Sequence, residues 1–439
     1  MPVFYAKKGL KSYVKMGPMP EKPFPDAEKL NLCYVADATN IHVRRWCGFF
    51  IRHGHNVTIL SDKGGEVEGA TVITLPNRDT MAGGGNGKKR KVSKTAVLLA
   101  RTKAIKKTLR TLNPDILHAI FAYQRGWSAA YTGFHPLVIT LLGSDIYLPR
   151  RHYRHKFQLW RDQWLNAMAL RQADFVTAVT ADLQHRADKM THNHVMSELI
   201  PIGVDTRLFL PDADARDLRQ RLAIPDGSFV VLSPRQITPL YNQETIIQAM
   251  PKVLQKLPNA VLILKDTVCD TEERKQYVAG LKKLAETLKV TEAIRWADHV
   301  PMEELPAFYS LANVVVSVPS TDGMPVTIFE AMSCQRPLIV GDLPSYDQVI
   351  IHGQTGLRVP VRNHVALAQA IVKISENPEL TARLVDESQL TLQEYGIFDQ
   401  QLWRMERYYQ GLKFRQIRSR SGLGRMLDRL LFRFLVRTT

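Results

Sequence analysis

The sequence predicts an α/β protein with two parallel sheets, each joined by its own crossover helices. Short apolar runs that end in turn residues alternate with helical stretches along the chain, which is typical of buried parallel strands connected by helices. The length of 439 residues suggests two or three domains, and 45% hydrophobic with 23% charged residues is a globular composition. Positive charge is concentrated in the first half and at the C-terminal end, so the two domains are expected to have different partners.

The first 203 residues contain the apolar runs expected for one of the sheets. The predicted strands are residues 30–36, 57–60, 71–75, 116–120, 137–142 and 175–179. Residues 42–53 are predicted to form the first crossover helix, which Gly54 stops.

Residues 78–94 interrupt this pattern with a glycine-rich and then basic segment. Because the segment has no hydrophobic periodicity, we predict a mobile surface loop there. A phosphate-binding Walker motif would need glycine at position 82 and serine or threonine at 89; the chain has Ala82 and Lys89, so we reject that interpretation. A nuclear-localisation signal is only weakly indicated, because short basic runs are usually solvated.

The phrase IPIGVDTRLFL at residues 200–210 indicates a turn and a change of charge balance. We therefore end the first domain (1–203) at residue 203 and place a second domain at residues 204–397. The predicted strands of the second sheet are 229–233, 260–265, 294–296, 314–318 and 337–340, and its predicted crossover helices are 244–257 and 271–289.

The formal net charge of +17 divides unevenly into +15 for residues 1–203, −5 for 204–412 and +7 for 413–439. A mildly acidic second domain disfavours a uniformly basic nucleic-acid coat and indicates that the first domain and the tail face an anionic partner.

The four cysteines form neither a C-x-x-C pair nor a secreted framework, so a cytoplasmic protein is expected. No run of 18 apolar residues and no signal-peptide core occurs in the sequence, and we expect neither a membrane span nor secretion.

The C-terminal segment 413–439 has the pattern of a basic amphipathic helix. From Leu423 onward arginines recur every four residues, and apolar side chains cover the other side of the same predicted helix. Such a helix suits a membrane interface, where apolar side chains enter the headgroup boundary and arginines meet anionic lipid. Packing on the protein itself or on a partner protein is the alternative. The predicted membrane contacts are Arg425, Arg429, Arg433, Arg437 and Phe434.

The most specific stretch of the sequence is 314–356. After the strand that ends at residue 318, a Pro-Ser turn leads to Asp322, and Glu330 follows at the opening of an apolar helix. Residues 323–327 offer backbone amides at a helix N-terminus, where the partial positive charge favours an anionic ligand. The two carboxylates can accept hydrogen bonds from hydroxyl groups on either side. A sugar, a diphosphate and a ribose would suit this arrangement.

This stretch closely resembles the donor-sugar half of the retaining nucleotide-diphosphosugar glycosyltransferases of family four. The resemblance rests on Asp322, seven residues, Glu330, then Pro337 and the Gly-x-Thr-Gly phrase at 353–356. Residues 200–209, 229–235 and 299–320 resemble other segments of the family in the expected order. The resemblance implies the GT-B fold, in which two doubly wound Rossmann-like domains face each other across a cleft. It also implies that helix 398–412 crosses back onto the first domain.

The resemblance further implies roles for individual residues. Arg235 is expected to contact the donor diphosphate, Glu330 the ribose hydroxyls and Asp322 the transferred sugar, which makes Asp322 and Arg235 the catalytic candidates. A surface ion pair for Arg235 and a helix-dipole interaction for Glu330 are the alternatives. The other donor-binding candidates are Tyr241, Asn242, Gly323, Met324, Pro325, Val326, Thr327 and Val300.

The sequence departs from the family pattern in both domains. Asp322 replaces the commoner glutamate, and Tyr241 and Asn242 occupy the place of a phosphate-binding lysine, a combination that marks a subgroup. Lys265 is a candidate to supply the missing charge. In the first domain Leu142 stands where many relatives have a histidine. The acceptor-side candidates are His42, Arg44, Arg45, Ser144 and Asp145, for each of which a buried or helix-surface role is equally open.

No metal and no organic cofactor is expected. Asp212 and Asp214 have the Asp-x-Asp spacing of metal-dependent transferases of another fold, but they lie in a turn before a helix, where capping is the ordinary role. Asp37, His42 and His118 lack metal-ligand spacing as well. Arginine and backbone dipoles would then have to stabilise the charge on a leaving diphosphate.

Together these features predict a retaining hexosyltransferase with a UDP- or GDP-type diphosphosugar as co-substrate. The expected acceptor is a hydroxyl of a lipid-linked molecule or glycolipid at the cytoplasmic membrane face, with an anionic membrane and no nucleic acid as partner. The resemblance implies same-face attack, with the leaving phosphate assisting deprotonation. The alternatives are transfer to a soluble acceptor, with the tail as an oligomer contact, and a non-catalytic or nucleic-acid-binding protein on the same fold.

Overall fold

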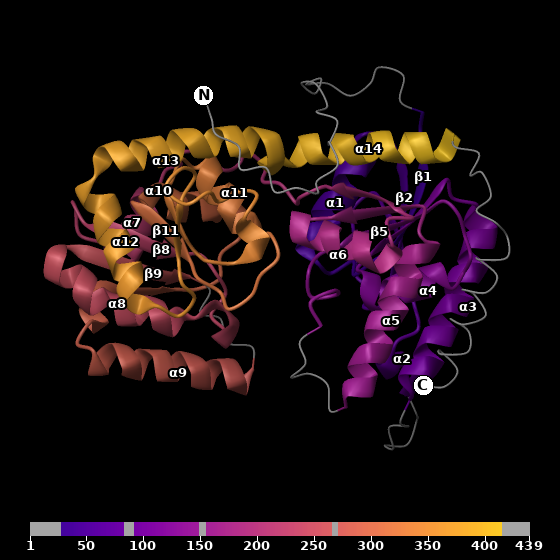
Figure 1. The fold of residues 1–439 in the computed structure, drawn as a ribbon, viewed down its shortest axis with the longest axis horizontal. Helices are drawn as coiled ribbons and strands as arrows, with labels where there is room; N and C mark the ends of the chain where they lie inside the picture. The colour runs from indigo at the N-terminus through magenta and orange to yellow at the C-terminus, as the bar shows by residue number, and fades with distance from the viewer. Residues whose placement is uncertain (1–27, 83–91, 149–154, 266–270, 415–439) are drawn as a thin grey trace.

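The computed structural model describes residues 28–82, 92–148, 155–265 and 271–414. The chain forms two α/β domains that lie side by side (Figure 1). Helix α14 runs along the upper edge of the first domain, and helix α13 runs along the upper edge of the second. Each domain contains one parallel sheet, as the alternating sequence pattern predicts. The tail contacts predicted at residues 425–437 lie outside the described residues.

The first domain is built on a seven-stranded parallel sheet in the order β3-β2-β1-β4-β5-β6-β7. Its central strands β4 and β5 are buried along their whole length, as expected where helices cover both faces of a sheet. The strands are β1 (Asn31–Val35), β2 (Asn56–Ser61), β3 (Thr71–Thr74), β4 (Ile116–Ile120), β5 (Leu137–Leu141), β6 (Phe175–Ala178) and β7 (Met196–Leu199).

The helices of the first domain begin at recognisable caps. Asn40 caps α1 by accepting hydrogen bonds from the amides of His42 and Val43, and Ser93 caps α3 through the amide of Ala96. The helices are α1 (Ile41–Arg52), α2 (Arg78–Ala82), α3 (Lys94–Leu112), α4 (Trp127–Ala130), α5 (Lys156–Gln172) and α6 (Ala181–Thr191).

The loop predicted over residues 78–94 was wrong at its start, because Arg78–Ala82 is the helix α2. The physical reason is a cap that the sequence pattern hid: the side chain of Asn77 accepts a hydrogen bond of 2.8 Å from the amide of Thr80. Residues 83–91 lie outside the described part of the chain. The edge strand β7 was also missed, since its sequence MSEL is half polar and only its last residue is buried.

The second domain has a six-stranded parallel sheet in the order β10-β9-β8-β11-β12-β13. The strands are β8 (Phe229–Ser233), β9 (Ala260–Lys265), β10 (Ile294–Ala297), β11 (Val314–Ser317), β12 (Leu338–Gly341) and β13 (Leu357–Val359). The helices are α7 (Arg216–Arg221), α8 (Gln243–Lys256), α9 (Glu272–Thr287), α10 (Leu305–Leu311), α11 (Val326–Ser333), α12 (His364–Glu376) and α13 (Pro378–Thr391), and the last helix of the described chain, α14 (Phe398–Phe414), returns to the first domain. The short edge strand β13 was not predicted, because three residues carry too little pattern to be recognised.

The chain passes between the domains twice at the same place. Val204 forms a parallel bridge with Ile397, so the outgoing and returning segments lie side by side. A side chain at Gly203 would place its Cβ 2.4 Å from the amide nitrogen of Phe398, which only glycine avoids. The two crossing segments therefore form a tightly packed connection.

Helix α14 packs on the first domain, as the sequence resemblance implies. The hydroxyl of Tyr409 lies 3.1 Å from the hydroxyl of Tyr34, and Glu406 forms a hydrogen bond of 3.0 Å with His55. Its apolar residues share a buried cluster with α1 and β1. The helix thereby ties the end of the described chain to its beginning. Among the described residues, no helix has the length and apolar character needed to cross a bilayer.

Candidate active site

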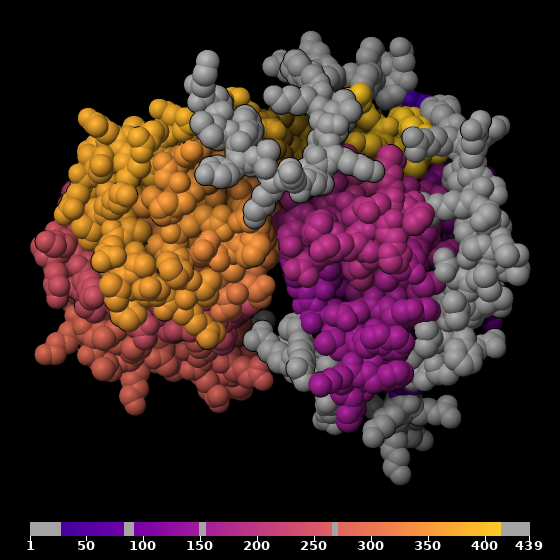
Figure 2. All heavy atoms as spheres, viewed as in Figure 1, coloured from indigo at the N-terminus to yellow at the C-terminus, as the bar shows by residue number. Residues whose placement is uncertain are grey.

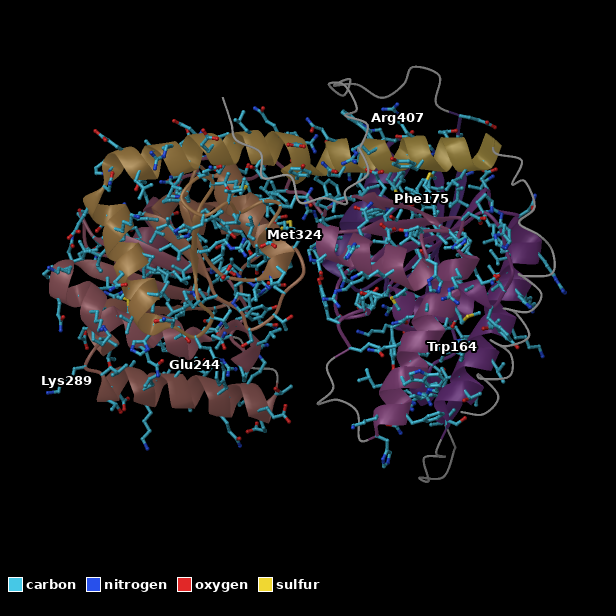
Figure 3. All side chains as sticks on the ribbon, in the orientation of Figure 1. Trp164, Phe175, Glu244, Lys289, Met324 and Arg407 are labelled. Atoms are coloured by element: carbon cyan, nitrogen blue, oxygen red, sulfur yellow. The ribbon has the colours of Figure 1, made fainter. Side chains whose placement is uncertain are left out.

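The candidate site lies where strands β8, β9 and β11 of the second sheet end, facing the first domain. Arg235 follows β8, Lys265 ends β9 and Asp322 follows β11. Because neighbouring parallel strands end at one edge of a sheet, side chains from distant parts of the sequence meet there. Figure 2 shows the two domains meeting along a narrow seam, and Met324 lies beside it in Figure 3.

Arg235 and Asp322 form an ion pair at the centre of the site. The guanidinium Nη2 lies 2.8 Å from Oδ2 of Asp322, and both side chains are more than four-fifths buried. The other oxygen of Asp322 accepts a hydrogen bond from the amide of Gly323, and Tyr346 donates to Oδ2 at 3.1 Å. Burial raises the pKa of Asp322, while the Arg235 charge and the Tyr346 hydroxyl act in the opposite direction. No signal in the sequence identified Tyr346.

The Tyr-Asn pair that replaces the expected lysine has two different roles. The ring of Tyr241 lies under the Arg235 guanidinium, 4.2 Å from ring centroid to guanidinium carbon. Asn242 is fully buried; its amide donates to the carbonyl of Val318, and its oxygen accepts from Ser320. Tyr241 thus orients the central cation, whereas Asn242 holds the loop after β11.

The N-terminus of α11 points into the same region without a side-chain cap. Pro325 occupies the cap position with no side-chain hydrogen bond to the helix amides, and the first turn contains no acid. The partial positive charge of this terminus is therefore not offset locally. Thr327 accepts a hydrogen bond of 3.2 Å from Arg235, while Met324 and Val326 are buried. An anion placed here would meet backbone amides and the guanidinium together.

Glu330 is buried one turn further along α11. It accepts a hydrogen bond from the hydroxyl of Tyr309, a partner that sequence reasoning missed. Burial raises the pKa of Glu330, and the opposing influences are the Tyr309 hydrogen bond and the charges of Arg45, Lys265 and Arg235. Lys265 is buried at the end of β9, and its charge is among the influences that lower the pKa of Glu330. Whether it contacts a diphosphate stays a prediction.

Helix α1 of the first domain brings His42 and Arg45 to the second domain. The positive charge of Arg45 lowers the pKa of Glu330, and the positive charge of Arg235 lowers the pKa of His42. Burial, followed by the charges of Arg45 and Arg235, lowers the pKa of His42 to about 4, so its imidazole is neutral near pH 7. The buried Nδ1 of His42 and Nη2 of Arg45 have no hydrogen-bond partner within the described parts of the chain. Two unpaired polar groups at a domain seam suit recognition of a polar ligand.

The other acceptor-side candidates lie in different surroundings. Arg44 points away to the carbonyl of Glu66, at 2.7 Å, and Ser144 is exposed. Asp145 is fully buried and accepts hydrogen bonds from the amides of Gly143 and Ala122 at 2.8 and 2.9 Å. Asp145 therefore shapes the loop after β5 from inside the domain. On the donor side, Val300 is half-buried against the core.

Gly323 lies close against the backbone of the first domain at the site. A Cβ at this position would lie 2.9 Å from the carbonyl oxygen of Leu142, closer than real Cβ contacts allow. We expect Gly323→Ala to push the domains apart and to lower kcat/KM by about tenfold to a hundredfold, because a displacement of about 1 Å can cost that much. Steady-state kinetics measure this effect.

Gly280 provides the matched control, since a Cβ there would meet nothing within 4 Å. Gly280→Ala is expected to leave kcat/KM unchanged. Equal activity of Gly323→Ala and the parent protein would show that catalysis does not need this close approach.

Within the residues that the structure describes, no group of His, Cys, Asp or Glu side chains is arranged to hold a metal ion. Of the Asp-x-Asp pair, Asp214 accepts hydrogen bonds from the amide and side chain of Arg216 in the first turn of α7.

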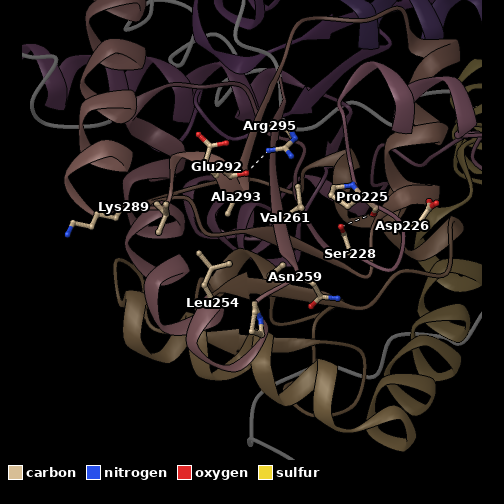
Figure 4. Close-up of a pocket in the computed structure, with 13 residues that line it drawn as sticks. Pro225, Asp226, Ser228, Leu254, Asn259, Val261, Lys289, Glu292, Ala293 and Arg295 are labelled. Carbon is tan, nitrogen blue, oxygen red and sulfur yellow. Dashed lines mark hydrogen bonds between the residues drawn. The ribbon is translucent and has the colours of Figure 1, made fainter.

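A pocket of about 310 Å³ in the second domain lies away from the candidate site, against the start of β9 at Ala260 and Val261 (Figure 4). It belongs to the opposite edge of the sheet from Arg235 and Asp322.

Two doubly wound domains that face each other, with charged groups gathered at the carboxyl ends of the second sheet, define the GT-B class. Sucrose-phosphate synthase from Thermosynechococcus elongatus has this fold with a TM-score of 0.71 at 20% identity, covering 88% of this chain and 99% of that chain. Anabaena Alr3699/HepE, solved in complex with UDP, gives a TM-score of 0.68 at 16% identity, covering 87% and 100%. The predicted GT-B fold is confirmed.

The sequence matches two glycosyltransferase family models, one in each domain. Residues 31–180 match the family described as Glycosyl transferase 4-like, and residues 214–391 match Glycosyl transferases group 1. The chain therefore combines two domains of the glycosyltransferase type.

Curated relatives are similar over parts of the chain. The GDP-mannose-dependent alpha-(1-6)-phosphatidylinositol monomannoside mannosyltransferase of Mycolicibacterium smegmatis is 27% identical over 48% of this chain and 56% of its own length. The putative teichuronic acid biosynthesis glycosyltransferase TuaC of Bacillus subtilis is 25% identical over 66% and 69%. The D-inositol 3-phosphate glycosyltransferase of Acidothermus cellulolyticus is 26% identical over 43% and 42%. The chain spans about half the length of the mycobacterial relatives that it matches.

Proposed function

We propose that this protein transfers a hexosyl group, with retention, from a nucleotide diphosphosugar to a hydroxyl of a lipid-linked or glycolipid acceptor at the cytoplasmic face of the membrane. The observation that carries the donor assignment is the Arg235–Asp322 pair at the uncapped N-terminus of α11. A diphosphate at this terminus would be held by the guanidinium and by backbone amides, without a metal ion. Glu330, one turn on, would accept hydrogen bonds from the ribose hydroxyls.

The same groups can support the chemical step. When the sugar–phosphate bond breaks, negative charge grows on the diphosphate, and Arg235 with the α11 amides would stabilise it. Asp322 would hold a hydroxyl of the transferred sugar while its other oxygen keeps the Gly323 amide. Same-face attack fits this arrangement, because the departing phosphate can take the proton from the acceptor hydroxyl.

The lipid acceptor is supported by charge and by similarity. The first domain carries +15, which favours an anionic partner. A relative named for phosphatidylinositol monomannoside transfers mannose from GDP-mannose, which supports a GDP-type donor and a glycolipid acceptor. The runner-up is a soluble phosphorylated acceptor, which the relatives named D-inositol 3-phosphate glycosyltransferase support. The basic amphipathic pattern of residues 413–439 favours the membrane location.

The test is transfer of labelled sugar from GDP-mannose, UDP-glucose or UDP-N-acetylglucosamine to a bacterial lipid extract or to inositol phosphates. We expect label from one donor in the organic phase and at least a hundredfold less with Asp322→Asn. Asp214→Asn is the matched control, because this acid is 61% exposed and forms its ion pair with Arg216 at the surface, away from the site. Label confined to the aqueous product would favour the soluble acceptor, and absence of transfer from every donor would contradict the proposed activity.

A further inference from the structure

The start of α5 presents two large aromatic side chains to solvent. Phe157 and Trp160 are 63% and 52% exposed, and their ring centroids lie 5.8 Å apart. Three residues apart on a helix, they share one face. Scattered exposed apolar residues need no explanation, but a contiguous aromatic pair indicates a contact surface. This end of α5 forms the lower tip of the first domain in Figure 1, on the side away from α14.

Two cationic side chains adjoin the aromatic pair. Lys156 is exposed beside Phe157, and Arg161, which follows Trp160, forms an ion pair of 2.7 Å with the buried Asp162. A cavity of about 330 Å³ lies between α2, α3 and α5 next to this tip, and Arg161 lines it. The charged side chains of its wall are Lys63, Arg78, Lys94, Arg101 and Arg161 against Asp62 and Asp79.

In the wall of the cavity, a buried cation has one nitrogen without a hydrogen-bond acceptor. Arg101 is 4% exposed, and its Nη2 lies 3.4 Å from Asp62, but its Nε has no partner in the described structure. Asp62 is already shared with Arg125 at 2.8 Å. The first turn of α3, which includes the wall residue Lys94, holds no acid to offset the helix dipole. The cavity is therefore suited to a phosphate group.

Aromatic side chains next to clustered cations are the combination that an anionic bilayer recognises. Tryptophan and phenylalanine enter the headgroup region, and each cation near the surface gains about 1 kcal/mol from anionic lipid. We propose that the tip of the first domain docks on an anionic phospholipid surface, with Phe157 and Trp160 in the interface and a lipid phosphate in the adjacent cavity. This inference rests on the proposed membrane location and names the surface that contacts the bilayer.

The test is flotation of the full chain with two kinds of vesicle, one of phosphatidylcholine alone and one that also contains about 30% phosphatidylglycerol. Each is tested at two salt concentrations. We expect Phe157→Ser with Trp160→Ser to weaken binding about tenfold or more, because both variant side chains lose the apolar burial of the aromatic rings in the interface. Arg78→Gln with Lys94→Gln should weaken binding to the anionic vesicles by about 25-fold at low salt and less at high salt. Leu390→Ser, at a 63% exposed leucine of α13, and Lys252→Gln with Lys256→Gln, exposed on α8, are the matched controls.

The same substitutions are also made in the full chain that carries Arg425→Gln, Arg429→Gln, Arg433→Gln, Arg437→Gln and Phe434→Ser, so that the tail does not hide their effect. If the parent floats and neither double variant differs from its control in this background, the inference is overturned and the proposed membrane location stands. If the parent binds no vesicle, both are overturned. Salt-sensitive binding to duplex DNA in place of vesicles would overturn both as well.

Discussion

Arg235→Ala is expected to lower kcat/KM for the donor by about a thousandfold. The guanidinium pairs with Asp322, donates to Thr327 and stacks on Tyr241, so it is held in place before any ligand binds. Removing one preorganised donor to a developing anion typically costs a hundredfold to a thousandfold in rate, about 2.7–4 kcal/mol. The effect should be at the upper end here, because Tyr241 and Asn242 stand where a second cation is expected. This loss is measured by steady-state kinetics, with the donor that the transfer assay identifies.

Two further variants separate charge from geometry. Arg235→Lys keeps the charge but loses the forked donors and the stacking on Tyr241, so it should recover only part of the activity. Arg216→Ala removes an 86% exposed arginine at the start of α7 and should have no effect. A kcat/KM for Arg235→Ala within fivefold of the parent would contradict a role in stabilising the diphosphate.

Glu330→Gln is expected to raise the donor KM and the nucleotide Kd by about tenfold to a hundredfold, with a smaller change in kcat. A buried carboxylate that accepts hydrogen bonds from both ribose hydroxyls would lose about 1.5–3 kcal/mol when it becomes a neutral amide. Since ribose does not react, this binding energy is shared by the ground state and the transition state. Titration calorimetry with the free nucleotide measures Kd without the chemical step.

A structural role for Glu330 predicts a different result. If the carboxylate only complemented the α11 dipole and Tyr309, Glu330→Gln would lower the unfolding temperature and leave the nucleotide Kd unchanged. Tyr309→Phe removes the same hydrogen bond but keeps the charge, so it should weaken nucleotide binding less than Glu330→Gln does. Equal Kd values for Glu330→Gln and the parent would exclude the ribose contact.

The sequence was sufficient to predict most of the fold, because buried parallel strands are continuous apolar runs. Such runs as Ile116–Ile120 and Ala260–Lys265 can hardly form anything else between helical stretches. Two of the elements that escaped prediction have little burial. Met196–Leu199 is an edge strand with two polar residues, and Arg78–Ala82 has no buried residue and depends on the Asn77 cap. Local polar contacts of this kind leave no periodic signal.

The candidate site was predictable only where its residues lie close together in the sequence. Asp322, Gly323 and Glu330 form one motif, and Arg235 follows a recognisable strand. Partners that reach them from other elements, such as Tyr309 and Tyr346, are visible only in three dimensions. The contact of Gly323 with Leu142 likewise depends on how the two domains meet, and it cannot be predicted from the two residue types.

The central claim is that Arg235 and Glu330 form a nucleotide-diphosphosugar site, and a thermal-shift titration tests it most directly. The purified protein and its Arg235→Ala, Glu330→Ala and Arg216→Ala variants are heated with GDP, UDP and ADP. A ligand at 100 times its Kd stabilises the native state by about 2.7 kcal/mol, which raises the unfolding temperature measurably. The account predicts a clear shift with one nucleotide, kept by Arg216→Ala and lost by the other two variants. Absence of a shift with every nucleotide, or an equal shift in all four proteins, would contradict it.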